Sequence, residues 1–227
     1  MQAERIDAQK YGPIGRCIYC GGSGGAKGLS DEHIIPYSLG GRAELLKASC
    51  SACAKETSRL ELYLGRNIFW ELRVHAGAPT RRRFPDELPA RILIGDAAIQ
   101  KLMPVADHPF FLLTPVWMPA GILRGVQPSA EFESASAHLY YFIPDNLRET
   151  LSLSAHETAE VRPQLTRGID YTTFARALTK VAYCQAVANI GFSEFRSLAT
   201  TDIILGRYPN VPYFVHSAYS GSAAAVR

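Results

Sequence analysis

The sequence feature that most constrains the fold is a pair of Cys-x-x-Cys motifs near the N-terminus. Cys17 and Cys20 form the first motif, Cys50 and Cys53 form the second, and 29 residues lie between the two motifs. Each motif places two sulfur atoms on one side of a tight turn, and two such turns complete the tetrahedron of thiolates that structural zinc prefers. A redox-active motif or unrelated buried cysteines are the alternatives, but a redox site needs only one pair. We therefore predict that these cysteines together hold a structural Zn²⁺ ion.

The composition is that of a globular protein in a reducing compartment. The 227 residues are 47% hydrophobic and 20% charged, so the chain can bury a sizeable core without disulfide bonds. No apolar run reaches the roughly 18 residues that a bilayer span needs, and the first residues lack the apolar core of a secretory signal. We expect a cytoplasmic protein without a membrane partner. The remaining cysteine, Cys184, lies in a helical pattern, and we expect it to be a small buried hydrophobic residue.

A strand with an acidic-acidic-histidine sequence lies between the two motifs. Residues 29–36 predict a short strand that ends at a proline, and residues 37–41 predict a turn. A helix is expected to begin at the second motif, so the predicted unit is a hairpin plus a helix stapled by zinc. Within the strand, Asp31 and Glu32 precede His33. Carboxylates offer oxygen ligands to a hard cation, and an imidazole titrates near neutral pH, so this sequence is a candidate catalytic site.

These motifs together resemble the HNH endonuclease family, whose ββα-metal fold is often held by a similar pair of zinc knuckles. The resemblance extends over about residues 15–62. The matching residues are Cys17, Cys20, Asp31 to Pro36, Gly40, Gly41, Cys50 and Cys53. The resemblance implies that His33 is the general base and that Glu32 ligates a catalytic Mg²⁺ or Mn²⁺ ion, with Asp31 as the alternative carboxylate.

Two positions depart from the family pattern. The family's middle Asn, which buttresses the base, would fall about five residues before Cys50, where this chain has Leu45 and then Leu46. The family's last metal ligand directly follows the second knuckle, where this chain has Ala54. Glu61 is the candidate replacement, because it lies seven residues later on nearly the same helix face. About 10 Å of axial rise separates the two positions, so this ligand requires a bent helix or a shifted site.

A helical pattern follows the second motif over about residues 52–75. Leucine and isoleucine recur every four residues along one side of this helix and form an apolar stripe. Basic residues lie nearly opposite the stripe and in the following loop: Lys55, Arg59, Arg66, Arg73, Arg81, Arg82 and Arg83. Residues 1–91 carry 14 Lys and Arg against 10 Asp and Glu, whereas residues 92–227 carry 10 against 11. In a nuclease such residues would contact phosphates through charge alone; the alternative is the ordinary solvated face of an amphipathic helix.

The rest of the chain predicts short strands and then helices. The strands are predicted at residues 91–95, 110–118 and 138–144, and the second of these is apolar enough to be buried. A helix is predicted over residues 170–189 with Asp170 as its N-cap, followed by a helical stretch at about residues 193–205. The core face of the helix at residues 170–189 is expected to carry Phe174, Leu178, Val181 and Ala188. Reactive side chains that we expect to be surface or packing residues are Arg176, Lys180, His138, His156 and His216.

We therefore predict an α+β protein in two parts. Residues 1–80 form the zinc-stapled ββα-metal module with its long basic helix, and residues 81–227 form a separate accessory α+β domain. The resemblance implies a metal-dependent endonuclease that hydrolyses phosphodiester bonds in nucleic acid, with DNA as the expected substrate. A non-catalytic zinc module that binds nucleic acid and a zinc-stabilised interaction subunit are the alternatives. The second domain is expected to position substrate, to form a homo-oligomer or to bind a partner protein.

Overall fold

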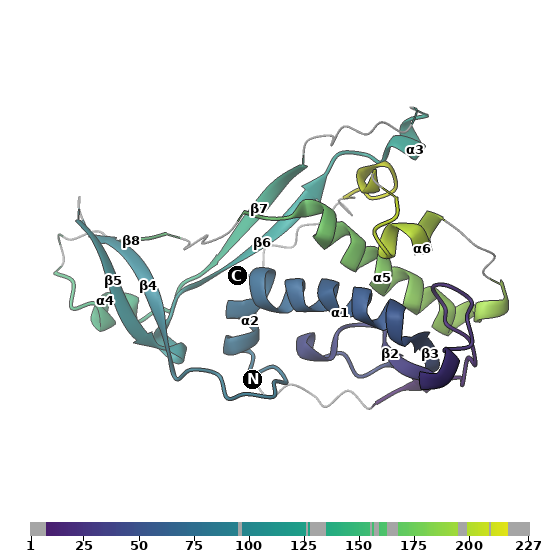
Figure 1. Ribbon diagram of the computed structural model, residues 1–227. Coiled ribbons are helices and arrows are strands. Elements are labelled where there is room, and N and C mark those ends of the chain that lie inside the picture. Colours follow the sequence, from purple (N-terminus) through teal and green to yellow (C-terminus); the bar gives the residue numbers. More distant parts are fainter. Residues whose placement is uncertain are drawn as a thin grey trace.

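The computed structural model describes most of the chain and has a mixed α and β architecture (Figure 1). The predicted α+β class is thereby confirmed. The described residues are 8–94, 97–125, 127, 135–154, 156, 159–162, 168–194, 199–208 and 210–217. Within them, no helix combines the length and the apolarity that crossing a bilayer requires.

The N-terminal part is a small sheet with a helix packed beside it. β2 (Leu29–His33) and β3 (Glu44–Cys50) pair antiparallel, and β1 (Lys10–Tyr11) runs parallel along the other edge of β3. α1 (Ser51–Tyr63) begins at the residue after Cys50, where the second cysteine motif predicts a helix. The predicted hairpin and helix are therefore present, and Figure 1 shows them at one end of the molecule.

The helix predicted over residues 52–75 is interrupted. It consists of α1, a π-helical segment (Leu64–Ile68) and α2 (Trp70–His75). A π-helical turn holds more residues than an α-helical turn, so the side chains after it are rotated relative to those of a continuous α-helix. Arg73 shows the consequence: although predicted on the exposed basic face, it is only 8% exposed. Its predicted position on the solvated side of the helix is therefore wrong.

α5 (Tyr171–Ile190) lies alongside α1 (Figure 1). Asp170 is its N-cap, as predicted, because the carboxylate accepts a hydrogen bond of 2.9 Å from the backbone N–H of Thr173. The predicted core face is wrong at Leu178, which is 41% exposed. Lys180, two residues later, is instead only 1% exposed and is among the most deeply buried side chains of the described residues.

One hydrophobic core joins the N-terminal part to the C-terminal helices. Buried residues of the first cysteine motif, of β3 and of α1, together with Ile34 directly after β2, pack with buried residues of α5 and of α6 (Ala199–Ile204). The members include Ile18, Ile34, Leu45, Leu60, Phe174, Ala175, Cys184, Val187, Ile203 and Ile204. Cys184 is fully buried, as predicted. The division into residues 1–80 and 81–227 stays a prediction, but this core crosses it.

The middle of the chain forms a second, smaller sheet. β4 (Glu87–Ile94) pairs antiparallel with β5 (Ala97–Pro104) on one edge and with β8 (Ala159–Arg162) on the other. Neither β5 nor β8 was predicted. The small core of this region consists of Ala90, Ile92, Met103 and Leu147, the last belonging to α4 (Leu147–Thr150).

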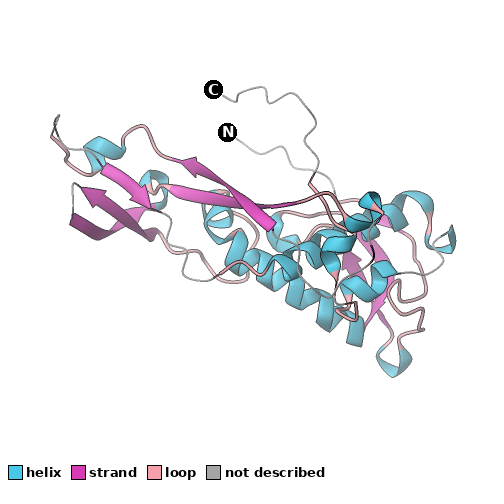
Figure 2. Cartoon of the chain, turned by 90° about the horizontal axis from the view of Figure 1, so that it is seen from above, coloured by secondary structure: helices cyan, strands magenta, loops and turns pink. Residues whose placement is uncertain are grey.

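β6 (Phe110–Trp117) and β7 (Ala135–Phe142) form a long hairpin that links this small sheet to the helical part of the molecule (Figure 1, Figure 2). The expectation that residues 110–118 are buried is wrong for most of the strand, because only Pro115 and Trp117 are fully buried. In a two-stranded sheet, side chains are buried only where another element packs against one of its faces, and such packing need not extend along the whole length of the strands. The short helix α3 (Gly121–Arg124) follows β6. Single 3₁₀ turns lie at Gly25–Lys27, Tyr37–Leu39, Val105–Asp107, Phe192–Glu194 and Val211–Tyr213.

Candidate active site and metal centre

The predicted zinc ligands come together in space. The sulfur atoms of Cys17, Cys20, Cys50 and Cys53 all lie within 4.8 Å of one another. The Cys20 and Cys50 sulfurs are 3.7 Å apart. Zinc–thiolate bonds of about 2.3 Å give a tetrahedron with edges of about 3.8 Å, so this spacing fits a zinc ion. The arrangement supports the structural Zn²⁺ predicted from the sequence.

The position of the second motif at a helix start favours the thiolate form of a ligand. Cys50 is the last residue of β3, and Cys53 lies in the first turn of α1. The backbone N–H of Cys53 donates to the Cys50 sulfur and lowers the pKa of this thiol to about 7. Burial raises the pKa of Cys17 and of Cys53, so their thiolates need a further positive charge nearby. A zinc ion between the sulfurs would supply that charge.

His33, the predicted base, has a carboxylate partner on the neighbouring strand. His33 and Glu44 are paired residues of β2 and β3, and the distance from His33 Nε2 to Glu44 Oε1 is 3.1 Å. The two side chains are 31% and 23% exposed, so solvent reaches the pair. Lys10 Nζ lies 3.9 Å from the other carboxylate oxygen of Glu44. The edge of the His33 ring also meets Tyr37, with 5.7 Å between the ring centroids.

An irregularity in the hairpin brings Glu44 to this position. Between two consecutive pairs of the ladder, β2 advances by two residues and β3 by four. Lys47, within the longer stretch, has a φ of 49°, a left-handed conformation that strands rarely contain. The carboxylate of Asp31 accepts a hydrogen bond of 2.8 Å from the backbone N–H of Lys47. Asp31, the alternative metal ligand, therefore stabilises this β-bulge.

The bulge explains why Glu44 was missed from the sequence. A count back from Cys50 assigns the place of the family's buttressing Asn to Leu45 and Leu46, but Leu45 is fully buried in the core. Because β3 contains extra residues, the polar residue opposite His33 is Glu44. The available signal was that Glu44 is the polar residue directly before this leucine pair.

Glu32 points away from His33, because neighbouring residues of a strand face opposite sides. Its side chain is 6% exposed, and Oε1 lies 3.0 Å from the Nζ atom of Lys180 in α5. Glu61 Oε1 lies 2.8 Å from the same Nζ atom. The two carboxylates predicted to hold a catalytic cation therefore do meet at a positive charge. That charge is the ammonium group of Lys180.

A divalent cation does not fit between these two carboxylates. Burial alone would lower the pKa of Lys180, but the Glu32 and Glu61 carboxylates offset this effect and raise the pKa above its ordinary value. The group is therefore charged at neutral pH, and an Mg²⁺ or Mn²⁺ ion bound to the same oxygens would meet an ammonium group at close range. In the described part of the chain, the cluster of three or more metal-ligating side chains is the cysteine site.

The predicted nucleic-acid-binding residues divide by exposure and pairing. Lys55, Arg66, Arg81 and Arg82 are exposed. Arg59 and Arg83 are exposed too but form ion pairs with Glu56 at 2.7 Å and with Asp86 at 2.8 Å, respectively. Arg73 is buried and donates hydrogen bonds to the backbone carbonyls of Ser38 and Gly65 at 2.7 and 2.8 Å. It supports the turn after β2 and is not part of an exposed basic face.

Basic groups beside His33 were not predicted. Lys10 contacts Glu44 as described, and Arg42 is exposed with its guanidinium 4.9 Å from the centre of the Tyr37 ring. Because Tyr37 also contacts His33, both cations lie close to the predicted base. Lys10 lies in β1, opposite Glu44 of β3, and Arg42 lies between β2 and β3.

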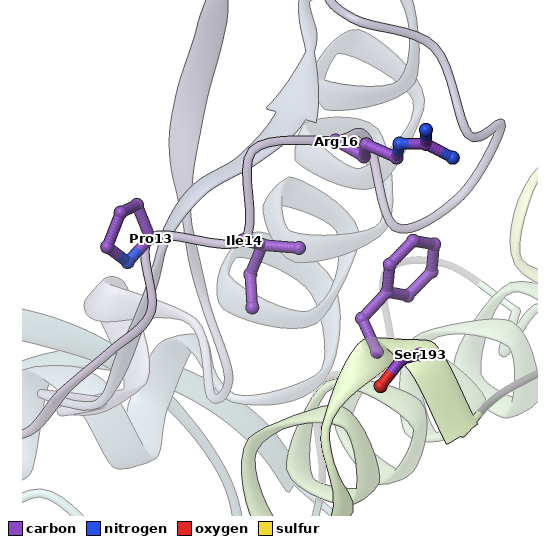
Figure 3. Close-up of a pocket in the computed structure, with 5 residues that line it drawn as sticks. Pro13, Ile14, Arg16 and Ser193 are labelled. Atoms are coloured by element: carbon purple, nitrogen blue, oxygen red, sulfur yellow. The ribbon is translucent and has the colours of Figure 1, made fainter.

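A shallow pocket lies elsewhere on the surface. It has a volume of about 590 Å³ and is lined by Pro13, Ile14, Arg16, Phe192 and Ser193. Figure 3 shows the loop that carries Pro13, Ile14 and Arg16 on one side and Ser193 on the other. No predicted catalytic residue lines this pocket.

Residues 17–69 match the model of a family described as HNH endonuclease. The matched segment contains the cysteine site, β2, β3 and α1, and nearly coincides with the region identified from the sequence motifs. The chain therefore contains an N-terminal HNH domain, which indicates a nuclease-type function and metal binding. Neither a curated protein nor a solved structure matches the chain.

Proposed function

We propose that this protein hydrolyses phosphodiester bonds in nucleic acid, with His33 as the general base and DNA as the first substrate to test. The observation that carries the proposal is the solvent-accessible pair of His33 and Glu44 within an HNH domain. A histidine held by a carboxylate is a common arrangement for removing a proton from a nucleophile near neutral pH.

In the proposed mechanism, Glu44 accepts a hydrogen bond from Nε2–H of His33. This fixes the tautomer in which Nδ1 carries the lone pair, and Nδ1 takes a proton from a water molecule. The resulting hydroxide attacks the phosphorus atom, and the bond to the leaving sugar oxygen breaks, with this oxygen keeping the electron pair and taking a proton from solvent water. Glu44 stabilises the imidazolium that forms, as an acid partner does in other histidine-based sites.

Basic residues around His33 would bind the phosphate backbone. Lys10 and Arg42 lie beside the pair and can counter the charge that develops on the phosphate. The further contacts to the nucleic-acid strand are proposed for four exposed basic residues: Lys55, Arg66, Arg81 and Arg82. Arg73 is left out because its guanidinium is held by buried backbone carbonyls. These contacts would act through charge and would weaken as salt is added.

The predicted Mg²⁺ or Mn²⁺ ion has no place in this mechanism at Glu32 and Glu61. Both carboxylates are paired with Lys180. The proposed steps therefore use only His33, Glu44 and the neighbouring cations. The structural zinc site would hold the HNH domain together and has no open position for chemistry.

A second candidate function is nucleic-acid binding without cleavage. The observation in its favour is the pairing of Glu32 with Lys180, which takes up the carboxylate that the family resemblance assigns to a catalytic metal. The presence of Ala54 at the place of the other family ligand has the same implication.

His33→Ala separates the two candidates. If His33 is the base, this variant loses at least about 100-fold of the rate of cleavage of plasmid DNA, single-stranded DNA or RNA, while its zinc content and melting temperature stay unchanged. His216→Ala is the matched control, because His216 is exposed and lies in a separate part of the chain. Equal cleavage by His33→Ala and the parent protein would rule out His33 as the base. Salt-dependent binding with no cleavage by either protein would favour the second candidate.

A further inference from the structure

Lys180 is surrounded by oxygen atoms from β2, from the residue that follows it and from α1. Its Nζ atom lies 3.0 Å from Glu32 Oε1 in β2 and 2.8 Å from Glu61 Oε1 in α1. It also donates to the backbone carbonyl of His33 and lies 3.5 Å from that of Ile34. A set of carboxylate and carbonyl oxygens is what a hard cation prefers, but here an amino group of the chain occupies it.

The depth of the Lys180 side chain excludes a surface role. Lys180 is 1% exposed and Glu32 is 6% exposed, whereas Glu61 is 26% exposed. A buried charge is costly unless it is paired and hydrogen-bonded, and here the ammonium compensates the Glu32 carboxylate directly. Removal of Lys180 would leave the Glu32 carboxylate uncompensated inside the shared core, whereas Lys180 still pairs with Glu61 when Glu32 is made neutral. The ion pairs of Lys180 are therefore part of the folded core.

We infer that Lys180 is a resident cation that takes the place of the divalent metal at Glu32 and Glu61, so that the HNH domain binds no Mg²⁺ or Mn²⁺ ion through these carboxylates. This assignment rests on the contacts of the Lys180 Nζ atom and does not depend on which substrate the protein acts on. Its consequence for catalysis rests on the proposed function: Lys180 is a positioning residue for His33, because its ammonium group donates a hydrogen bond to the backbone carbonyl of that residue.

This assignment also explains the departure at Ala54. A divalent ion would need a second protein ligand at the position of Ala54. The ammonium group of Lys180 does not, because it is covalently attached to α5. Glu61, two helical turns further along, then serves as the second carboxylate because a lysine side chain can reach it. The axial rise that argues against Glu61 as a metal ligand is no obstacle to a contact with Lys180.

The first test measures Mn²⁺ binding to the full-length, zinc-loaded protein by titration calorimetry and by the paramagnetic resonance signal of free Mn²⁺. The parent protein and Glu32→Gln are expected to give the same Mn²⁺ titration, because Lys180 already occupies the carboxylate. A loss of Mn²⁺ affinity of about tenfold or more in Glu32→Gln would overturn the inference, since it would show that Glu32 holds a divalent ion.

The second test removes the resident charge. Lys180→Met keeps much of the length and apolar volume of the side chain, and it is expected to gain a Mn²⁺ site at least about tenfold tighter than any in the parent protein. The matched control is the double variant Lys180→Met with Glu32→Gln, which is expected to lose that site. A folded Lys180→Met variant that gains no Mn²⁺ binding would contradict the inference. If Lys180→Met folds only when Mn²⁺ is added, the inference is supported. If it folds neither with nor without Mn²⁺, the comparison of the Mn²⁺ titrations of the parent protein and Glu32→Gln tests the inference.

The outcome is independent of nuclease activity. Mn²⁺ binding through Glu32 would overturn the resident-cation assignment and leave His33 as a candidate base. Equal cleavage by His33→Ala and the parent protein would overturn the proposed function and leave the Mn²⁺ results unaffected.

Discussion

The strand residues Glu32 and His33 are neighbours in sequence but lie in different environments. His33 pairs with Glu44 where both side chains are partly exposed, at 31% and 23%. Glu32 pairs with Lys180 where both are nearly inaccessible, at 6% and 1%. Strand alternation accounts for this separation, because it turns one side chain to solvent and the next to the core. The exposed pair can meet a water molecule and a phosphate, whereas the buried pair can act only through the fold.

Glu44→Gln tests the exposed pair. The amide keeps the size of the side chain but removes the charge that stabilises a protonated His33, so kcat is expected to fall by about 10-fold to 100-fold with KM little changed. A carboxylate in a fully buried catalytic triad contributes more, and the partial exposure of Glu44 reduces the effect expected here. Steady-state kinetics on a labelled oligonucleotide would measure both constants.

Glu56→Gln is the control for this variant. Glu56 also forms an ion pair, with Arg59 on the exposed side of α1, but it has no contact with His33. Its kinetic constants should match those of the parent protein. If Glu44→Gln behaves like Glu56→Gln, Glu44 does not support a base at His33.

At the scale of the element, the cysteine site connects the loop before β2 to the junction of β3 and α1. Cys17 and Cys20 lie in that loop, Cys50 ends β3, and Cys53 lies in the first turn of α1. The hairpin that carries His33 and Glu44 is thus tied to its helix at one point. In small units of this kind, metal binding and folding are coupled, because the ligands converge only in the folded state.

Cys20→Ser is expected to abolish stoichiometric zinc binding and to lower the melting temperature. The hydroxyl group replaces one thiolate of the tetrahedral set, and the remaining sulfurs hold the ion less tightly. Elemental analysis of the purified protein and thermal unfolding followed by circular dichroism would measure the two effects. Cys184→Ala is the control, because Cys184 is buried in α5 and is not one of the four clustered sulfurs, so its loss should leave zinc content unchanged. Full zinc occupancy in Cys20→Ser would contradict the assignment of Cys20 as a ligand.

At the scale of the whole molecule, the HNH domain does not have a core of its own. Phe174, Cys184 and Val187 of α5 belong to the same hydrophobic cluster as Leu45 and Leu60. The Tyr183 hydroxyl of α5 donates a hydrogen bond of 2.6 Å to the carbonyl of Ile18 in the first cysteine motif. Lys180 adds the ion pairs with Glu32 and Glu61 to this apolar contact. The helix α5 therefore completes the domain that the family model matches.

A fragment of residues 1–80 tests this view. Without α5, the fragment exposes the apolar surface that packs against that helix and leaves the Glu32 carboxylate without Lys180, so it is expected to show no cooperative unfolding transition even with zinc present. Circular dichroism during heating, with the full-length chain as the reference under the same zinc concentration, would measure the difference. A sharp transition in the fragment would show that residues 1–80 fold as an independent domain.

Features that depend on neighbouring residues could be predicted from the sequence. The spacing of the cysteines predicts their convergence, the run from Leu29 predicts β2, and Asp170 predicts the start of α5. Each of these signals acts over a few residues, through turn geometry, strand alternation or capping. The HNH resemblance and the choice of His33 as base came from the same local patterns.

Other features depend on irregular backbone. Glu44 faces His33 because β3 contains a bulge at Lys47, which a count of residues from Cys50 does not anticipate. Arg73 is buried because the π-helical segment changes the phase of the helix that contains it. In both cases a local insertion changes which side chains share a face, although the hydrophobic pattern on either side is unaltered.

The sequence by itself determined the cysteine cluster and the hairpin and helix around it, and it named Glu32 and Glu61 as carboxylates expected to share one cation. Only the tertiary structure decided that this charge belongs to Lys180, which lies 147 residues after His33 in the chain. The physical reason is that a buried ion pair is specified by two distant segments at once. Neither segment alone carries a local pattern that distinguishes a buried lysine from a solvated one.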